Sequence, residues 1–325
     1  MSRPGWRFGL RALTTGALLA CLLWQIDLGA VARQLHDLRY PWLLAALALT
    51  VPQVVISAWR WRLTARCMGL TLSMGAAIRE YYLATFLNQV LPGGVLGDAN
   101  RAWRHARSDV HTAAAWHAVF IERFSGQLSL ALVTVVAFWQ SPSLVQGIAA
   151  RIAAAELATP WGMAVVAALV LLASLGIVLV WRYTRAANAI ASFANNLWRS
   201  LLARRVWPAQ FASSLAVVAS YIGVFLLCAP AIGLSTPAST LLWLIPPVLL
   251  AMALPLSIAG WGLRESAAAV VWSLAGLPAH EGVALSLCYG AVVLVSSLPG
   301  AVVLGCSSGV RSARGASSMN ANTRK

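Results

Sequence analysis

The sequence has 325 residues, of which 60% are hydrophobic and only 10% are charged, a balance that excludes an ordinary soluble globular protein. Its formal net charge of +15 would suggest a nucleic-acid-binding protein if the chain were soluble. The basic residues instead lie mostly beside apolar runs about 20 residues long, the length that crosses a bilayer. We therefore expect contact with anionic lipid headgroups and no nucleic-acid partner.

Six apolar segments are predicted to cross the membrane as helices. The first follows Arg3, Arg7 and Arg11 and resembles a signal peptide, but its apolar run continues past Cys21, so we interpret it as a span. The basic connection 182–210 is expected to lie on the membrane surface. The polar residues from Ser307 onward predict a disordered tail, 307–325, after a single transmembrane domain, 1–306. The predicted spans are 11–27, 41–59, 112–138, 161–181, 211–233 and 282–304.

The arginines indicate the orientation of these spans. Nineteen of the 24 basic residues fall in segments that can all lie on one side, whereas only Arg33, Arg39 and Arg151 fall in the opposite loops. By the positive-inside rule, the arginine-rich side is cytoplasmic, and so are both termini.

This topology places two interrupted segments in the membrane without letting either of them cross. Segment 75–108 begins and ends on the cytoplasmic side, and segment 239–276 begins and ends on the outer side. Irregular backbone at membrane depth is tolerated only where protein or a wet cavity surrounds it, and paired broken helices are typical of transporter sites. We therefore expect an all-α polytopic membrane protein with about six spans and two re-entrant hairpins from opposite faces.

The turns of the two hairpins share a pattern. Both Leu91–Arg101 and Leu254–Arg264 contain Leu-Pro, then Gly, then Arg at the same offsets. This coincidence suggests an inverted repeat.

The first turn carries an unusual set of residues for an apolar chain. Pro92 ends the preceding helix, and Gly93, Gly94 and Gly97 allow the backbone to approach a ligand closely. Asp98 and Arg101 follow at a helix start, where an anion can bind. They form either a lipid headgroup site or only a helix cap and an arginine that reaches the membrane edge.

Glu122 and Arg123 lie inside the predicted span 112–138. Because a charge at such depth costs about 2.5–3.5 kcal/mol, both side chains must face protein or water. We expect Glu122 to meet Arg101 or Arg264, and Arg123 to meet Asp98. A substrate site and a purely structural ion pair remain equally compatible with this pattern.

The second turn offers a contact from the opposite side. Pro255, Gly260 and Gly262 permit the turn, and Arg264 and Glu265 open the following helix. Arg264 can contact a phosphate or carboxylate, or Glu265 can simply neutralise it.

These motifs resemble the signatures of the lysylphosphatidylglycerol synthetase transmembrane family, the flippase-like domain. Leu91–Arg101 is similar to its L-P-G-G-x-G-G-D-x-x-R motif, except that Leu96 replaces a glycine. Glu122-Arg123 resembles its acidic-Arg pair, and Leu254–Glu265 resembles its second signature. The resemblance covers about residues 10–305 and implies lipid translocation in a bacterial inner membrane. It does not imply lysyl transfer, because we expect no soluble aminoacyl-transfer domain.

The sequence thus predicts a flippase that moves a phospholipid or polyprenyl-type lipid through a polar site formed by the two hairpins. A membrane-embedded lipid-modifying enzyme and a non-transporting scaffold of an envelope-lipid pathway are the alternatives. With no nucleophile, metal or nucleotide motif found, we expect no enzyme, no cofactor and no metal. Anionic phospholipid is the expected partner, and a homo-oligomer stays open. The predicted substrate-binding residues are Pro92, Gly93, Gly94, Gly97, Asp98, Arg101, Glu122, Arg123, Pro255, Gly260, Gly262, Arg264 and Glu265.

Overall fold

The regular structure of the described chain is entirely helical, which confirms the predicted all-α class. The computed structural model describes residues 28–36, 38–91, 95–108, 112–142, 145–147, 149–150, 193, 196–203, 206–252 and 261–322. Four helices in these ranges are long and apolar enough to cross a membrane, so the chain is a multi-pass membrane protein. They are α3 (Tyr40–Cys67), α6 (Thr112–Gln140), α10 (Trp207–Ala231) and, within α13 (Ala279–Asn322), residues Ala279–Gly305.

These four helices correspond to the second, third, fifth and sixth predicted spans. The first and fourth predicted spans, 11–27 and 161–181, lie outside the described residues. The other helices of the described chain are shorter than a bilayer crossing requires. They are α2 (Leu28–Gln34), α4 (Met74–Val90), α5 (Leu96–Ser108), η1 (Trp198–Leu202), α11 (Ala238–Met252) and α12 (Leu263–Leu274).

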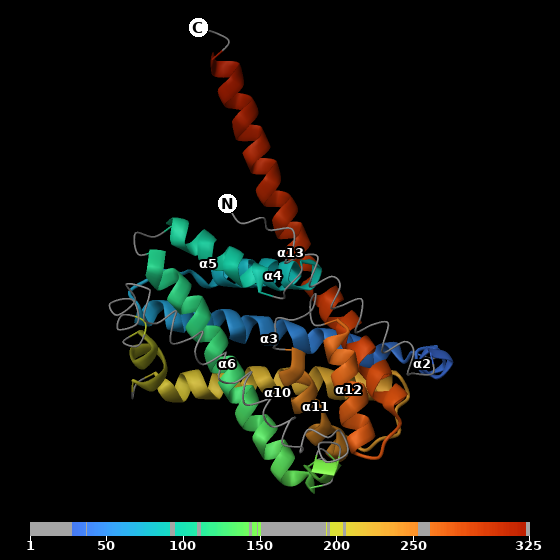
Figure 1. The fold of residues 1–325 in the computed structure, drawn as a ribbon. Helices are drawn as coiled ribbons and strands as arrows, with labels where there is room; N and C mark the ends of the chain where they lie inside the picture. Colours follow the sequence, from blue (N-terminus) through green and yellow to red (C-terminus); the bar gives the residue numbers. More distant parts are fainter. Residues whose placement is uncertain are drawn as a thin grey trace, which may run out of the picture.

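Helices α3 and α10 pack side by side along their lengths (Figure 1). They are antiparallel, because Leu49 of α3 meets Gly223 of α10 while Arg60 of α3 meets Ser214 of α10. The backbone N–H of Arg39 also donates to the carbonyl of Ala231 at 2.8 Å, which ties the start of α3 to the end of α10. This pair also packs against α6 and α13, contacts α4 through α3, and contacts α11 through α10.

The first hairpin consists of α4 and α5, the two arms that the sequence predicted. The arms pack on each other, and α5 also packs on α6 while α4 packs on α13. Gly97 lies where α5 touches α4, and a Cβ at this position would clash with the carbonyl group of Ala84. Gly300 permits an equally close approach of α13 to Tyr82 of α4.

The second hairpin consists of α11 and α12, which match the predicted arms 239–257 and 262–276 in position. It packs against α6 and α13 at the end of the molecule that lies opposite α5 (Figure 1). A large apolar core joins α10, α11, α12 and α13, with Phe225, Ile245, Trp272 and Leu285 among its fully buried members. Burial of this apolar surface fixes the hairpin against the spans.

Two boundaries differ from the sequence prediction. The second span was expected to end at residue 59, but α3 continues to Cys67, so Arg60 is an internal helical residue. Arginine is a good helix former, and an acidic side chain on a neighbouring helix can neutralise its charge. The sixth span was expected to end at residue 304, whereas α13 continues to Asn322. Extension of an existing helix needs no new nucleation, which explains why these small and polar residues can remain helical.

Candidate functional site

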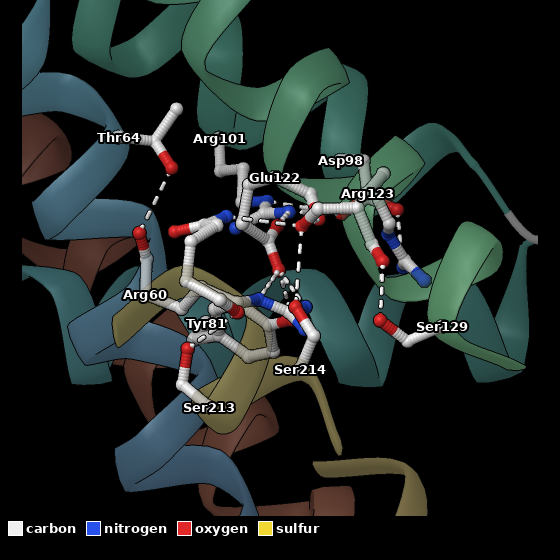
Figure 2. A network of polar contacts seen from close by, with 12 residues as sticks. Arg60, Thr64, Tyr81, Asp98, Arg101, Glu122, Arg123, Ser129, Ser213 and Ser214 are labelled. Carbon is white, nitrogen blue, oxygen red and sulfur yellow. Dashed lines mark hydrogen bonds and ion pairs between the residues drawn. The ribbon is translucent and has the colours of Figure 1, made fainter. Parts of the chain in front are cut away.

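Glu122, near the middle of α6, is the centre of a buried network of charges (Figure 2). Its Oε2 accepts a hydrogen bond from Nη2 of Arg101 on α5 at 2.6 Å. Its Oε1 accepts from Arg60 on α3, through Nη2 and, at 3.2 Å, through Nε. Glu122 and both arginines are buried, so three helices are joined by charge-assisted hydrogen bonds away from water.

Asp98 provides the second carboxylate of the network. It is in the first turn of α5, and its Oδ1 accepts from Nε of Arg101 at 2.9 Å. Its Oδ2 accepts from Arg123 of α6 and, at 2.9 Å, from the side-chain amide of Asn88 on α4. Asp98 therefore orients two arginines at once, and Asn88 holds Asp98 in place.

Aromatic rings form the walls around Arg101. Its guanidinium lies 4.6 Å from the centre of the Tyr81 ring and 4.9 Å from that of Trp61. The Tyr81 hydroxyl also donates to Oε1 of Glu122 at 3.4 Å. The Nη1 of Arg101 is buried and has no hydrogen-bond partner among the described residues. Since a buried unpaired donor is costly, this N–H group is available for an anionic oxygen.

Helix α10 closes the network with neutral polar groups (Figure 2). Ser214 accepts a hydrogen bond from Nη1 of Arg60 at 3.2 Å. Gln210 donates to the hydroxyl of Ser125 on α6 at 3.0 Å, and all three side chains are buried. Gly126 leaves room for the guanidinium, because a Cβ there would lie 3.2 Å from Nη2 of Arg60.

The network has an excess of positive charge and one exposed edge. It contains three arginines against the two carboxylates of Asp98 and Glu122, which leaves one positive charge uncompensated. The side chain of Arg123 is 40% exposed, whereas those of Arg60 and Arg101 are buried. Beside Arg123 on the same face of α6, the rings of Phe120 and Phe124 are exposed and stack at 6.5 Å.

The predicted residues of the first turn have different outcomes. Asp98 and Arg101 are in the network, as are the predicted pairs Glu122 with Arg101 and Arg123 with Asp98. The N–H of Gly97 donates to the side-chain oxygen of Asn88 at 2.7 Å, so it is engaged within the hairpin. Pro92, Gly93 and Gly94 lie outside the described residues.

Arg264 and Glu265 form a second cluster at the start of α12. Glu265 Oε1 accepts from Nη2 of Arg264 at 2.6 Å, and Nε of Arg264 also donates to Ser286 of α13 at 2.8 Å. The guanidinium lies 5.2 Å from the Trp261 ring centre and 5.3 Å from that of Tyr289. Both charges are buried and compensate each other.

Two glycines shape this second cluster. Gly262 has a φ of 81°, a left-handed conformation that favours glycine, and its N–H donates to Oε2 of Glu265 at 2.6 Å. A Cβ at Gly290 of α13 would clash with Nη2 of Arg264, so this glycine makes room for the arginine. Pro255 and Gly260, the other predicted residues of this turn, lie outside the described residues.

Of the two predicted partners of Glu122, Arg101 forms the pair and Arg264 does not. Glu122 is paired with Arg60 and Arg101, and Arg264 is paired with its neighbour Glu265. The single polar site expected from the sequence is thus divided into two clusters. The adjacent acid on α12 provides a local partner for Arg264, so no charge has to be supplied from α6.

Arg60 is the functional candidate that sequence reasoning missed. It was assigned to the cytoplasmic side because it follows the apolar run of the second predicted span. A signal was present, since Gln53, Ser57, Arg60 and Thr64 recur at helical spacing and form one buried polar stripe on α3. Such a stripe on an apolar helix indicates a buried arginine rather than a loop residue.

Most of the chain matches a known protein family. The family model described as "Lysylphosphatidylglycerol synthase TM region" matches residues 9–300. No curated protein matches the chain.

Proposed function

The chain belongs to the lysylphosphatidylglycerol synthase transmembrane-region family, and from that premise we propose that it moves an anionic phospholipid between the leaflets of a bacterial inner membrane. Membership supports a membrane protein linked to lipid handling. The observation that carries the finer proposal is the buried network of Arg60, Asp98, Arg101, Glu122 and Arg123, with its one uncompensated positive charge.

All members of this network except Arg123 are buried, and an excess charge in such surroundings is costly without a counter-ion. The phosphodiester of a phospholipid carries one negative charge and offers oxygens that accept hydrogen bonds from arginines. Nη1 of Arg101 and Nε of Arg123 are buried donors without a partner among the described residues. A headgroup bound here would balance the charge and satisfy these donors.

Access for a lipid follows from the exposed edge of the network. Arg123 lies on the face of α6 that also exposes Phe120 and Phe124. Exposed aromatic rings suit contact with acyl chains, while the guanidinium takes the headgroup. The tails can therefore stay in the bilayer as the phosphate approaches Arg123 first and Arg101 second.

The two re-entrant hairpins give this site a position inside the membrane. The α4–α5 hairpin supplies Asp98 and Arg101, and we assign it and both termini to the cytoplasmic side. The α11–α12 hairpin supplies Arg264 from the opposite side. A polar contact on each side of the membrane is what translocation of a headgroup needs.

The experiment that tests this proposal is leaflet exchange in proteoliposomes. Vesicles contain nitrobenzoxadiazole-labelled phosphatidylglycerol, and added dithionite destroys the label in the outer leaflet only. The protein is expected to make the inner label accessible within minutes, whereas protein-free vesicles retain about half. Equal rates with and without protein, over a panel of anionic lipids, would overturn the proposed function. A new lipid product found by mass spectrometry would instead favour a lipid-modifying enzyme.

A further inference from the structure

The two arginine clusters have the same local design. In the first, Arg101 lies 4.6 Å from the ring centre of Tyr81. In the second, Arg264 lies 5.3 Å from the ring centre of Tyr289. Each cluster thus combines a buried guanidinium with a tyrosine from a neighbouring helix, α4 in one case and α13 in the other.

Helix α10 connects the two clusters. Ser214 accepts from Arg60 of the first cluster at 3.2 Å, and Phe225 stacks on Tyr289 of the second with ring centres 3.9 Å apart. These two residues are eleven positions apart, which corresponds to about 16 Å along a helix. A headgroup phosphate cannot contact both clusters at once over this distance.

Tyr221 lies on the same face of α10 between Ser214 and Phe225. Seven residues separate it from Ser214 and four from Phe225, spacings that bring all three side chains to one side of a helix. Figure 1 shows α10 running from the η1 end to the end where α11 and α12 pack. Tyr221 is partly exposed, unlike Phe225, and packs against the apolar core.

Tyr221 lies on α10 between the two contacts that join this helix to the clusters, the hydrogen bond of Ser214 with Arg60 and the ring stack of Phe225 on Tyr289. Three tyrosines, on α4, α10 and α13, therefore form a series from one arginine cluster to the other.

The chemistry of a phenol suits the middle of such a path. Its O–H donates to a phosphate oxygen, yet it carries no charge that would hold the anion tightly. A hydrogen bond to a charged group in an apolar surrounding is stronger than one between neutral groups.

We propose that Tyr221 is the middle contact of the headgroup path, donating a hydrogen bond to the lipid phosphate as it passes between the Arg101 cluster and the Arg264 cluster. This inference rests on the proposed function, and it adds a residue that the family motifs do not contain. It assigns Tyr221 to the transfer step, while Arg101 and Arg123 serve initial binding.

The test compares Tyr221→Phe with Tyr40→Phe in the leaflet-exchange assay. Both variants lose only a hydroxyl group. Tyr40 is exposed at the start of α3, away from the middle of α10 where Tyr221 lies. We expect Tyr221→Phe to slow exchange of labelled phosphatidylglycerol about tenfold, as loss of one hydrogen bond to a charged group predicts. Tyr40→Phe should exchange at the wild-type rate.

A second readout separates contact from a merely structural role. Binding of labelled phosphatidylglycerol to the detergent-solubilised protein should be half-saturated at the same lipid fraction for Tyr221→Phe and wild type. The two proteins should also have the same melting temperature. The inference alone would be overturned if Tyr221→Phe exchanged lipid at the wild-type rate. It would also be overturned if weaker lipid binding and a lower melting temperature accounted for the slower exchange. A wild type no faster than empty vesicles would overturn the proposed function, and the inference with it.

Discussion

Arg101 donates to Glu122 at 2.6 Å in a place where both side chains are fully buried. The two residues come from α5 and α6, so this contact joins the α4–α5 hairpin to a helix long enough to span the membrane. Arg60 of α3 shares the same carboxylate. Glu122 is consequently the residue whose loss leaves the most charge without a partner.

We predict that Glu122→Gln strongly destabilises the protein. The substitution leaves Arg60 and Arg101 buried without their shared carboxylate, and breaking a buried pair in this way costs about 3–5 kcal/mol. The melting temperature in detergent should fall by several degrees. Glu281→Gln is the matched control, because Glu281 is partly exposed and its carboxylate accepts a hydrogen bond from the neutral Thr236 at 3.1 Å. Equal melting temperatures of the two variants would contradict the central position of Glu122.

A second prediction concerns two arginines of α3. Arg60 contacts Glu122 through two nitrogens and Ser214 through the third. Lysine keeps the charge but cannot reproduce this geometry. Arg60→Lys should therefore slow leaflet exchange about tenfold, the rate change that corresponds to the free energy of one charge-assisted hydrogen bond. Arg66→Lys, at an exposed position of the same helix, should leave the rate unchanged; a normal rate for Arg60→Lys would mean that only the charge of Arg60 matters.

The second cluster can be perturbed without removing any of its charges. In Gly290→Ala the new methyl group meets Nη2 of Arg264 and must displace it from Glu265 and Tyr289. We expect slower exchange and a lower melting temperature. Gly75→Ala is the control, since nothing lies within 4 Å of a Cβ there. If Gly290→Ala exchanged lipid like Gly75→Ala, the position of Arg264 would be irrelevant to transport.

The uncompensated charge of the first network predicts a preference among lipids. Phosphatidylglycerol brings one negative charge, whereas phosphatidylcholine also brings a cation that the three arginines repel. With matched acyl chains and the same label, phosphatidylglycerol should exchange at least about tenfold faster, the effect of a charge interaction worth about 1.4 kcal/mol in a partly desolvated site. The measurement is the ratio of the two rates in the same vesicles, and a ratio near one would argue against charge selection.

The sequence predicted the helical class and both hairpins because apolar runs, prolines and the arginine distribution depend on local composition and on the membrane itself. It also predicted two pairs of the network, Glu122 with Arg101 and Arg123 with Asp98, because a charge in an apolar helix needs a partner. It did not predict Arg60, since the end of an apolar run does not show where a helix ends. It also did not predict that the charges form two separate clusters. The partner of Arg264 depends on how α12 packs on α13 rather than on the residue pattern of either helix.

The most direct test of the account compares the wild type with Arg101→Gln in the leaflet-exchange assay with labelled phosphatidylglycerol. Arg107→Gln serves as the control, because Arg107 is exposed on the same helix. The account predicts that wild type and Arg107→Gln exchange the lipid rapidly, while Arg101→Gln, recovered as folded protein, falls to the rate of empty vesicles. Rapid exchange by Arg101→Gln, or a wild type no faster than empty vesicles, would contradict it.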